Sequence, residues 1–194
     1  MKYVILAAAL VMPTLMAPAA NAAEGKHVIG GSIGLGVQND DDISRFNPDA
    51  GNTEDNDSSD SWGTELYYRY HFTPNWGVEA GYLWSDAGIV HAFTSGITEL
   101  QMDSFEAARV SLYGRWGFTE RNSFYAKLGA ARVKLEYQYT KDGAGFNDTE
   151  NGLHAAAGWE YRFRNNLGIN TEYVYLKTDN FDYQGVFVGL SYRF

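Results

Sequence analysis

Hydrophobic and polar residues alternate with a period of two along most of the chain after residue 26. In residues 62–72, for example, Trp62, Leu66 and Tyr70 alternate with polar residues such as Glu65 and Arg69. A period of two places successive side chains on opposite faces of a β-strand, whereas a helix repeats every 3.6 residues. The pattern therefore predicts half-buried strands, and we expect eight of them, at residues 27–37, 62–72, 76–84, 105–118, 124–139, 153–163, 167–176 and 183–194.

The fifth predicted strand departs from strict alternation. Ala126 and Leu128 share one parity, whereas Val133 and Leu135 have the other. An extra residue at a β-bulge moves all later side chains to the opposite face of a strand. The sequence therefore predicts a bulge near residues 129–131.

The connections between the predicted strands alternate between short turns, such as residues 73–75, and long polar segments, such as residues 38–61 and 141–152. Transmembrane barrels combine short periplasmic turns with long extracellular loops, and two aromatic girdles flank their apolar band. A soluble sandwich or lipocalin-like barrel also alternates, but its core has no reason to sort aromatic rings into two girdles. We expect a periplasmic girdle containing Phe72, Trp76, Trp116, Phe118, Phe163 and Tyr192. We expect an extracellular girdle of Trp62, Tyr82, Trp84, Tyr137, Tyr139, Tyr173, Tyr175 and Tyr183. The predicted fold is all-β, an eight-stranded antiparallel up-and-down transmembrane β-barrel.

The start of the chain has the pattern of a secretory signal peptide. Lys2 precedes an apolar run at residues 4–12, which is too short to cross a bilayer as a helix and is followed by Pro13. Residues 20–22 read Ala-Asn-Ala, a typical cleavage site. These features favour a cleaved signal peptide over an anchor helix. We expect a signal peptide at residues 1–22 and a barrel domain at residues 23–194.

Composition narrows the possible functions. The chain has 14 Tyr, 11 Phe, 5 Trp and 21 Gly, a mixture that suits strands better than helices. It has no cysteine, which excludes disulfides, thiol chemistry and cysteine-ligated metals. Its formal net charge of −9 disfavours nucleic acid as a partner.

Three segments carry a family resemblance: residues 72–82, residues 124–130 and the closing residues 188–194. With them the chain resembles the OmpA-like transmembrane domain and other small eight-stranded outer-membrane β-barrel proteins. The resemblance implies a location in the outer membrane of a Gram-negative cell, in contact with lipid and lipopolysaccharide. It also implies that Tyr192 and Phe194 form the signal read by the outer-membrane assembly machinery.

Ten charged residues occupy the polar rows of the predicted strands. Eight strands enclose a lumen just wide enough for side chains, and an isolated buried charge is costly, so these charges should pair. In the resembled family such a network plugs the lumen. We expect Glu79 and Glu160 near its middle, as partners of Arg109, Arg115 or Lys127. The predicted network is Glu65, Arg69, Glu79, Arg109, Arg115, Lys127, Glu160, Arg162, Glu172 and Arg193.

These features predict a structural or surface-interaction protein with no catalytic, cofactor or metal site, which contacts an extracellular ligand through its loops. A narrow channel for small ions or solutes is the alternative, and an enzyme acting on lipid A is a third. No histidine lies two residues before a serine on one strand face, the pattern expected of a lipid A deacylase. His91 and Ser95 leave open an acyltransferase at the extracellular rim. Residues 38–61 hold eight acidic residues and one basic residue, which predicts a solvated acidic loop or, alternatively, divalent-cation binding.

Overall fold

The computed structural model describes residues 25–40, 58–86, 100–139 and 145–194. The predicted signal peptide, most of the first acidic segment, and His91 with Ser95 lie outside the described residues. The side chains of Tyr137 and Tyr139 do so as well.

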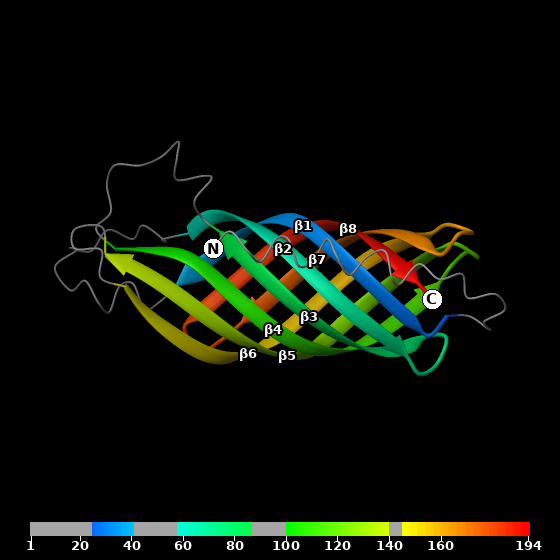
Figure 1. The fold of residues 1–194 in the computed structure, drawn as a ribbon, viewed down its shortest axis with the longest axis horizontal. Helices are drawn as coiled ribbons and strands as arrows, with labels where there is room; N and C mark the ends of the chain where they lie inside the picture. The colour runs from blue at the N-terminus through cyan, green and yellow to red at the C-terminus, as the bar shows by residue number, and fades with distance from the viewer. Residues whose placement is uncertain (1–24, 41–57, 87–99, 140–144) are drawn as a thin grey trace.

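Eight antiparallel strands close into a barrel in which each strand pairs with its neighbours in the sequence (Figure 1). The eight-stranded antiparallel fold predicted from alternation is confirmed. Among the described ranges, no helix is long and apolar enough to cross a membrane. The strands are β1 (His27–Asp40), β2 (Ser58–His71), β3 (Trp76–Asp86), β4 (Leu100–Gly117), β5 (Asn122–Tyr139), β6 (Gly145–Arg162), β7 (Leu167–Lys177) and β8 (Phe181–Arg193).

Pairing between β1 and β8 closes the barrel along its full length, from Val28 opposite Arg193 to Asp40 opposite Phe181. Two backbone hydrogen bonds extend this seam to residue 194: His27 N–H donates to the Phe194 carbonyl at 3.0 Å, and Phe194 N–H donates to the His27 carbonyl at 2.8 Å. Closure gives every strand two partners, so the barrel presents no unpaired edge.

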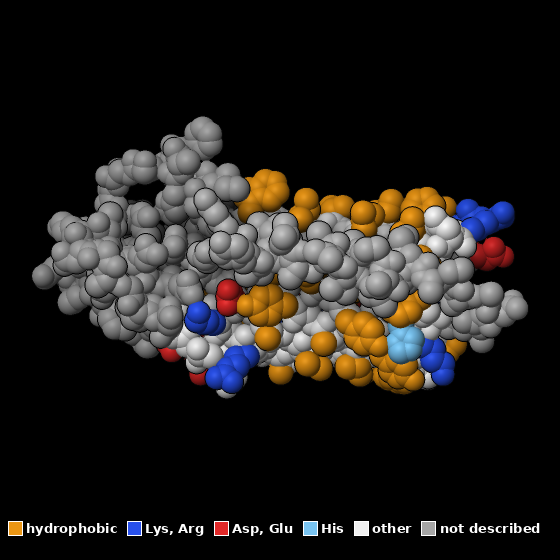
Figure 2. Space-filling model, viewed as in Figure 1, with side chains coloured by type: hydrophobic (Ala, Val, Ile, Leu, Met, Phe, Trp, Pro, Cys, Tyr) orange, Lys and Arg blue, Asp and Glu red, His pale blue; other side chains and the backbone are white. Residues whose placement is uncertain are grey.

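The outer surface of the barrel is apolar. Leu190 is 64% exposed, Leu128 is 59% exposed and Ile33 is 58% exposed. Figure 2 shows hydrophobic side chains along the flank of the barrel and charged side chains toward its ends. A continuous apolar belt of this kind is far larger than the patches on soluble monomers, and it matches the lipid-facing band of a membrane barrel.

The strands are longer than predicted at the end opposite the short turns. Gln38 pairs with Ser59, and Gln138 pairs with Gly145, so both lie within ladders. The first connection therefore shortens to residues 41–57, and most of the predicted loop at 141–152 belongs to β6. Polar composition suggested loops there, but ladder hydrogen bonds depend on the backbone and tolerate polar side chains.

The bulge predicted at residues 129–131 is wrong. Pairing of β5 with β4 runs without interruption through Gly129, Ala130 and Ala131, and the register shift in this ladder lies in β4 between Met102 and Ser104. Val133 and Leu135 are fully buried inside the barrel. The inward row of β5 therefore changes from polar to apolar at this point, and no side chain switches face. The interior has a charged part toward the short turns and an apolar part toward the other end. The buried apolar cluster contains Leu83, Phe105, Ala107, Ala131, Val133, Leu135, Ala156, Val174, Leu176, Phe181, Tyr183 and Phe187.

Candidate functional site: a filled lumen

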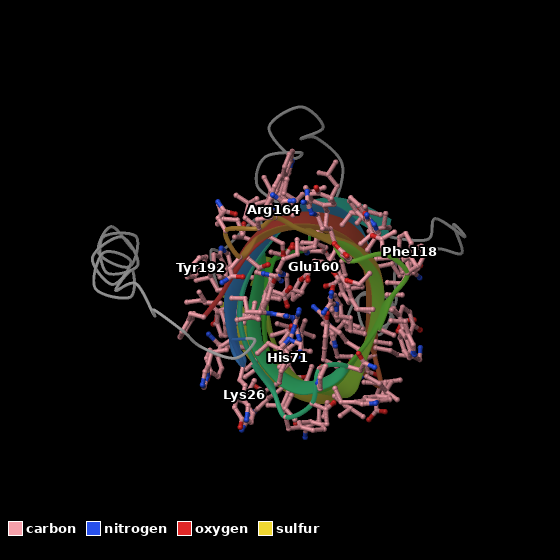
Figure 3. The ribbon with its side chains drawn as sticks, turned by 90° about the vertical axis from the view of Figure 1, so that its right-hand side faces the viewer. Lys26, His71, Phe118, Glu160, Arg164 and Tyr192 are labelled. Carbon is pink, nitrogen blue, oxygen red and sulfur yellow. The ribbon has the colours of Figure 1, made fainter. Side chains whose placement is uncertain are left out.

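All ten charges singled out from the sequence lie on inward-facing rows of the strands. Eight of them are buried, and Arg115 and Arg193 are half-buried near the end with the short turns. Figure 3 looks into that end and shows Glu160 and His71 pointing into the barrel from different parts of its wall. Strand alternation explains the placement, because a strand that turns its apolar row outward must turn the other row inward.

Glu79 is the centre of the charge network. Its carboxylate accepts from Arg69 at 2.6 Å, from Arg109 at 2.6 Å and from Lys127 at 2.7 Å. The Glu79 side chain is fully buried, and its three partners are nearly so. One carboxylate thus contacts cations from three different strands, β2, β4 and β5.

The network continues on both sides of Glu79. Arg109 also pairs with Glu65, and Lys127 Nζ lies 2.6 Å from an oxygen of Glu172. Ser32 donates a long hydrogen bond of 3.5 Å to Glu65. Buried charges are tolerated when they are paired and hydrogen-bonded, and these carboxylates meet that condition.

Glu160 has different partners from those expected. It pairs with Arg162 at 2.7 Å and with Arg69 at 3.6 Å, and not with Arg109, Arg115 or Lys127. Arg162 follows Glu160 by two residues on β6, so both side chains face inward next to each other. Alternation along β6 predicted that Glu160 faces the lumen. Whether it meets Arg69 depends on the axial position of β6 relative to β2.

Aromatic rings cover the cations of the network. The Arg69 guanidinium carbon lies 3.6 Å from the Tyr113 ring centroid and 5.3 Å from that of Tyr67. Lys127 Nζ lies 5.1 Å from the Tyr67 ring and 5.5 Å from the Tyr125 ring. Cation–π contact of this kind stabilises a desolvated cation. These tyrosines were not among the predicted site residues, although their inward parity was a signal that could have identified them.

Glycines make room for these large side chains. A Cβ atom added at Gly81 would lie 2.9 Å from the Arg109 guanidinium, and one at Gly30 would clash with the Tyr67 ring. Both glycines lie on inward-facing rows. The arrangement places large residues opposite small ones, which is how a narrow lumen is filled without gaps.

The apolar part of the lumen is built around aromatic rings. Phe105 lies 5.0 Å from Phe181 and 4.9 Å from Tyr183, and Tyr183 lies 6.4 Å from Phe187 (all centroid distances). Tyr183 was predicted in the extracellular girdle, and that prediction is wrong, because its side chain is fully buried in the lumen. Tyr183 lies four residues before Phe187 on β8, so both side chains face the lumen, while Val186 and Val188 face outward. We call these four rings, Phe105, Phe181, Tyr183 and Phe187, the aromatic plug.

Ser111 and His154 form a pair that the sequence did not reveal. Their Oγ and Nδ1 atoms lie 2.9 Å apart, although the residues are 43 positions apart in the chain. Both side chains are buried within the lumen, so the pair faces neither lipid nor solvent. Its geometry fits a structural hydrogen bond, since a nucleophile must reach its substrate. Within the described residues, no three His, Asp or Glu side chains gather as a metal site would require.

The aromatic residues assigned to the periplasmic girdle lie around the outer rim at the short-turn end. Trp116 and Phe118 are 55% exposed, and the rings of Trp76 and Trp116 meet edge to face at 6.2 Å. The Tyr192 and Phe194 rings stack at 6.3 Å next to the barrel seam. Figure 3 shows Phe118 and Tyr192 on the outside of the wall.

Comparison with known proteins agrees with this architecture. Residues 6–194 match the family described as outer membrane protein beta-barrel domain. The attachment invasion locus protein of Yersinia enterocolitica is 27% identical over 144 residues, which cover 74% of this chain and 77% of that protein.

Three solved structures of two proteins share the fold. The attachment invasion locus protein of Yersinia pestis has a TM-score of 0.59 at 22% identity, with 89% of this chain and 100% of that chain covered. It has also been solved in complex with the heparin analogue sucrose octasulfate, with a TM-score of 0.55 at 21% identity, covering 87% of this chain and 99% of that one. Neisserial surface protein A has a TM-score of 0.65 at 11% identity, with 89% of this chain and 100% of that chain covered. The family match, the closed barrel and its apolar exterior together show that the chain belongs to the outer membrane protein beta-barrel domain family and is an eight-stranded outer-membrane barrel.

Proposed function

We propose that this protein is a sealed outer-membrane scaffold that presents its extracellular segments to a partner, and that it does not conduct. The observation that carries the proposal is the filling of the lumen by two successive layers. The first is the charge network around Glu79, and the second is the aromatic plug.

A channel is the less favoured function because an ion would have to pass both layers. Separating Glu79 from its three cations would leave buried charges unpaired, which is costly. Beyond them, Phe105 and Phe187 are fully buried among other apolar side chains, and apolar constrictions exclude water and ions.

Conductance in planar bilayers tests the proposal. Purified protein, checked for folding by heat-modifiable gel mobility, is expected to give no current steps above the lipid background at any applied voltage. The double variant Phe105→Ala with Phe187→Ala should also stay silent, because the charge network still fills the lumen. Stable single-channel currents from the unaltered protein would refute the scaffold proposal.

The charge of the first extracellular connection gives the partner a chemical character. Residues 41–57 contain six acidic residues and one basic residue, so they repel polyanions. We therefore infer that a ligand of the heparin type, as seen with the Yersinia pestis protein, is not the partner of this segment. A cationic surface, or an anionic one bridged by divalent cations, fits better.

Cells displaying the protein can test this inference. A variant in which Asp41, Asp42, Asp49, Asp55 and Asp57 become Asn removes the charge and keeps the side-chain size. We expect the native protein to bind immobilised polylysine more strongly than the variant does, and to bind heparin weakly. A calcium-dependent gain in heparin binding by the native protein alone would identify the bridged mode. Strong heparin binding by both proteins in the presence of a chelator would contradict the inference.

Export, assembly and the lack of enzymatic activity are part of the same proposal. A signal peptide at residues 1–22 would direct the chain to the outer membrane of a Gram-negative cell, where the barrel contacts lipid and lipopolysaccharide. The assembly machinery would read Tyr192 and Phe194 on the closing strand. If mass spectrometry of the mature protein gives the mass of a chain that starts at Ala23, the result supports export with cleavage. A mass that includes residues 1–22 would contradict it. Lipid A of unchanged mass in expressing cells is the expected outcome for a protein without enzymatic activity.

A further inference from the structure

The charges of the lumen are not balanced along its length. Among the described residues, the carboxylates of Glu65, Glu79, Glu160 and Glu172 pair with Arg69, Arg109, Lys127 and Arg162. Arg115 and Arg193 make no ion pair with any carboxylate of the described chain. Both lie at the short-turn end, so positive charge accumulates at that mouth of the barrel.

Arg115 and Arg193 have donors without acceptors. The Nε atom of each is buried and has no hydrogen-bond partner in the described part of the chain, and the same is true of His71 Nδ1. Arg193 Nη2 lies 3.5 Å from His71 Nε2, and the His71 ring packs edge-on against Tyr113 at 5.4 Å. Arg162 is the last residue of β6, so it lies at the same end of the barrel.

Arg162, the third arginine of this mouth, differs from the other two because its donors are used. Its Nε donates to Glu160, its Nη1 to the Asn166 carbonyl at 2.8 Å, and its Nη2 to Ser191 Oγ at 3.2 Å. Arg162 therefore braces the wall next to the β6–β7 turn. The free donor capacity belongs to Arg115 and Arg193.

A hollow of about 260 Å³ opens at the same mouth and has His71 and Arg193 in its lining, together with Lys26 and Thr73. One water molecule accounts for roughly 30 Å³ of liquid volume, so the hollow has room for an anion with four oxygens. Figure 3 is drawn from this end and shows Lys26 at the rim and His71 inside.

We propose that the periplasmic mouth of the barrel binds a phosphate-type oxyanion in this hollow, between Arg193 and His71, with Lys26 at the entrance and Arg115 adding positive charge at the same end. A guanidinium group donates two parallel hydrogen bonds to phosphate, and desolvated donors around a shared space favour an anion that satisfies them together. This site is separate from the extracellular partner surface of the proposed function. Its periplasmic location requires only that the short turns of the barrel face the periplasm.

The oxyanion has two possible sources with the same chemistry. One is the phosphate of a phospholipid headgroup in the inner leaflet next to the rim, and the other is a soluble phosphate in the periplasm. Both present non-bridging phosphate oxygens to the guanidinium groups, so the experiment has one arm for each source.

Nuclear magnetic resonance of the full barrel in nanodiscs tests the proposal. The His71 ring and the arginine Nε–H resonances are followed, with His71→Asn used to assign the histidine. In the first arm, inorganic phosphate is added to nanodiscs of a neutral galactolipid, which carries no phosphate, with chloride of equal ionic strength as the reference. In the second arm, phosphate is omitted and anionic phosphatidylglycerol replaces part of the lipid. Saturable shifts in the first arm identify soluble phosphate, and shifts in the second identify the headgroup.

Variants distinguish a specific phosphate site from nonspecific electrostatic attraction of phosphate to the positively charged mouth. Arg193→Gln should weaken phosphate binding at least tenfold, and Arg115→Gln should weaken it less, because Arg115 does not line the hollow. Arg164→Gln, in the exposed β6–β7 turn, is the matched control and should leave binding unchanged. Heat-modifiable mobility verifies that each variant is folded. Lack of any shift in both arms, or equal weakening by Arg164→Gln, would overturn the proposal, and neither result would affect the sealed-scaffold proposal.

Discussion

Replacing Glu79 by Gln probes the charge network at its centre. The substitution keeps the size of the side chain and removes one negative charge. Glu79 is fully buried and contacts Arg69, Arg109 and Lys127 at 2.6, 2.6 and 2.7 Å. The variant would leave these cations with less compensation in a part of the lumen that excludes water.

The expected loss of stability follows from these contacts. Hydrogen bonds to charged groups contribute roughly 1.5–3 kcal/mol each. The carboxamide oxygen of Gln can keep one of the three contacts, so two charge-assisted interactions are lost. Removing one partner of a buried ion pair typically costs about 3–5 kcal/mol, which agrees with this sum. We expect Glu79→Gln to lower the free energy of unfolding by about 3–5 kcal/mol.

Urea unfolding in lipid vesicles, followed by tryptophan fluorescence and heat-modifiable mobility, measures the change. Glu172→Gln is the matched control, because Glu172 contacts only Lys127 among the ion pairs of the described chain, and it should cost less. Adding Arg69→Met to Glu79→Gln should recover part of the loss, because one cation that has lost its close partner disappears while Glu160 keeps its pair with Arg162.

A cost below about 0.5 kcal/mol, the size of an ordinary surface substitution, would refute this reasoning. So would a double variant whose loss equals the sum of the two single losses. Either result would mean that water or movement of the arginines compensates for the lost carboxylate.

Three further predictions concern packing and assembly. Gly34→Ala should cost about 1–3 kcal/mol in urea unfolding, because its Cβ would clash with the Val186 carbonyl oxygen and lie 2.6 Å from the Phe187 ring. Gly31→Ala on the outer face of the same strand should cost less, because the closest contact of its Cβ would be the flexible end of Leu66, at 3.1 Å, and equal costs would contradict the close packing. Phe105→Ala should lower the free energy of unfolding by about 3–5 kcal/mol by opening a cavity in the aromatic plug, and a loss under 1 kcal/mol would argue against a packed plug. Phe194→Ala should slow the appearance of the heat-modifiable form in pulse-labelled cells, because it removes a ring that stacks on Tyr192 and His27 at the barrel seam; unchanged kinetics would show that the ring is not needed.

The strands and their inward rows could be predicted because alternation is a local property. Each strand shows its own period of two, and no knowledge of its neighbours is needed to separate Glu65 and Arg69 from Leu66. The ten charges were assigned to one face in this way. Strand bounds were less predictable, since residues such as Gln38 and Gly145 join the ladder through backbone pairing that side-chain chemistry does not report.

The apolar part of the lumen could not be predicted from any single strand. The change of parity at Val133 and Leu135 looked like a bulge because apolar residues were assumed to face outward. An inward apolar residue is stable only if the residues across the lumen are apolar too. Phe105 and Leu176 meet that condition, but they come from β4 and β7. Tyr183 was misplaced for the same reason.

By itself, the sequence determined that the chain alternates, that its apolar rows suit a bilayer, and which charges face inward, because all of these depend on neighbouring residues along one strand. Closure of the barrel decided the rest. The tertiary structure set the height of each strand against the others, and with it the three cations around Glu79, the pairing of Glu160 with Arg162, and the surplus of arginine at one mouth. Contacts across the lumen depend on the register and stagger of all eight strands together, and no local pattern contains that information.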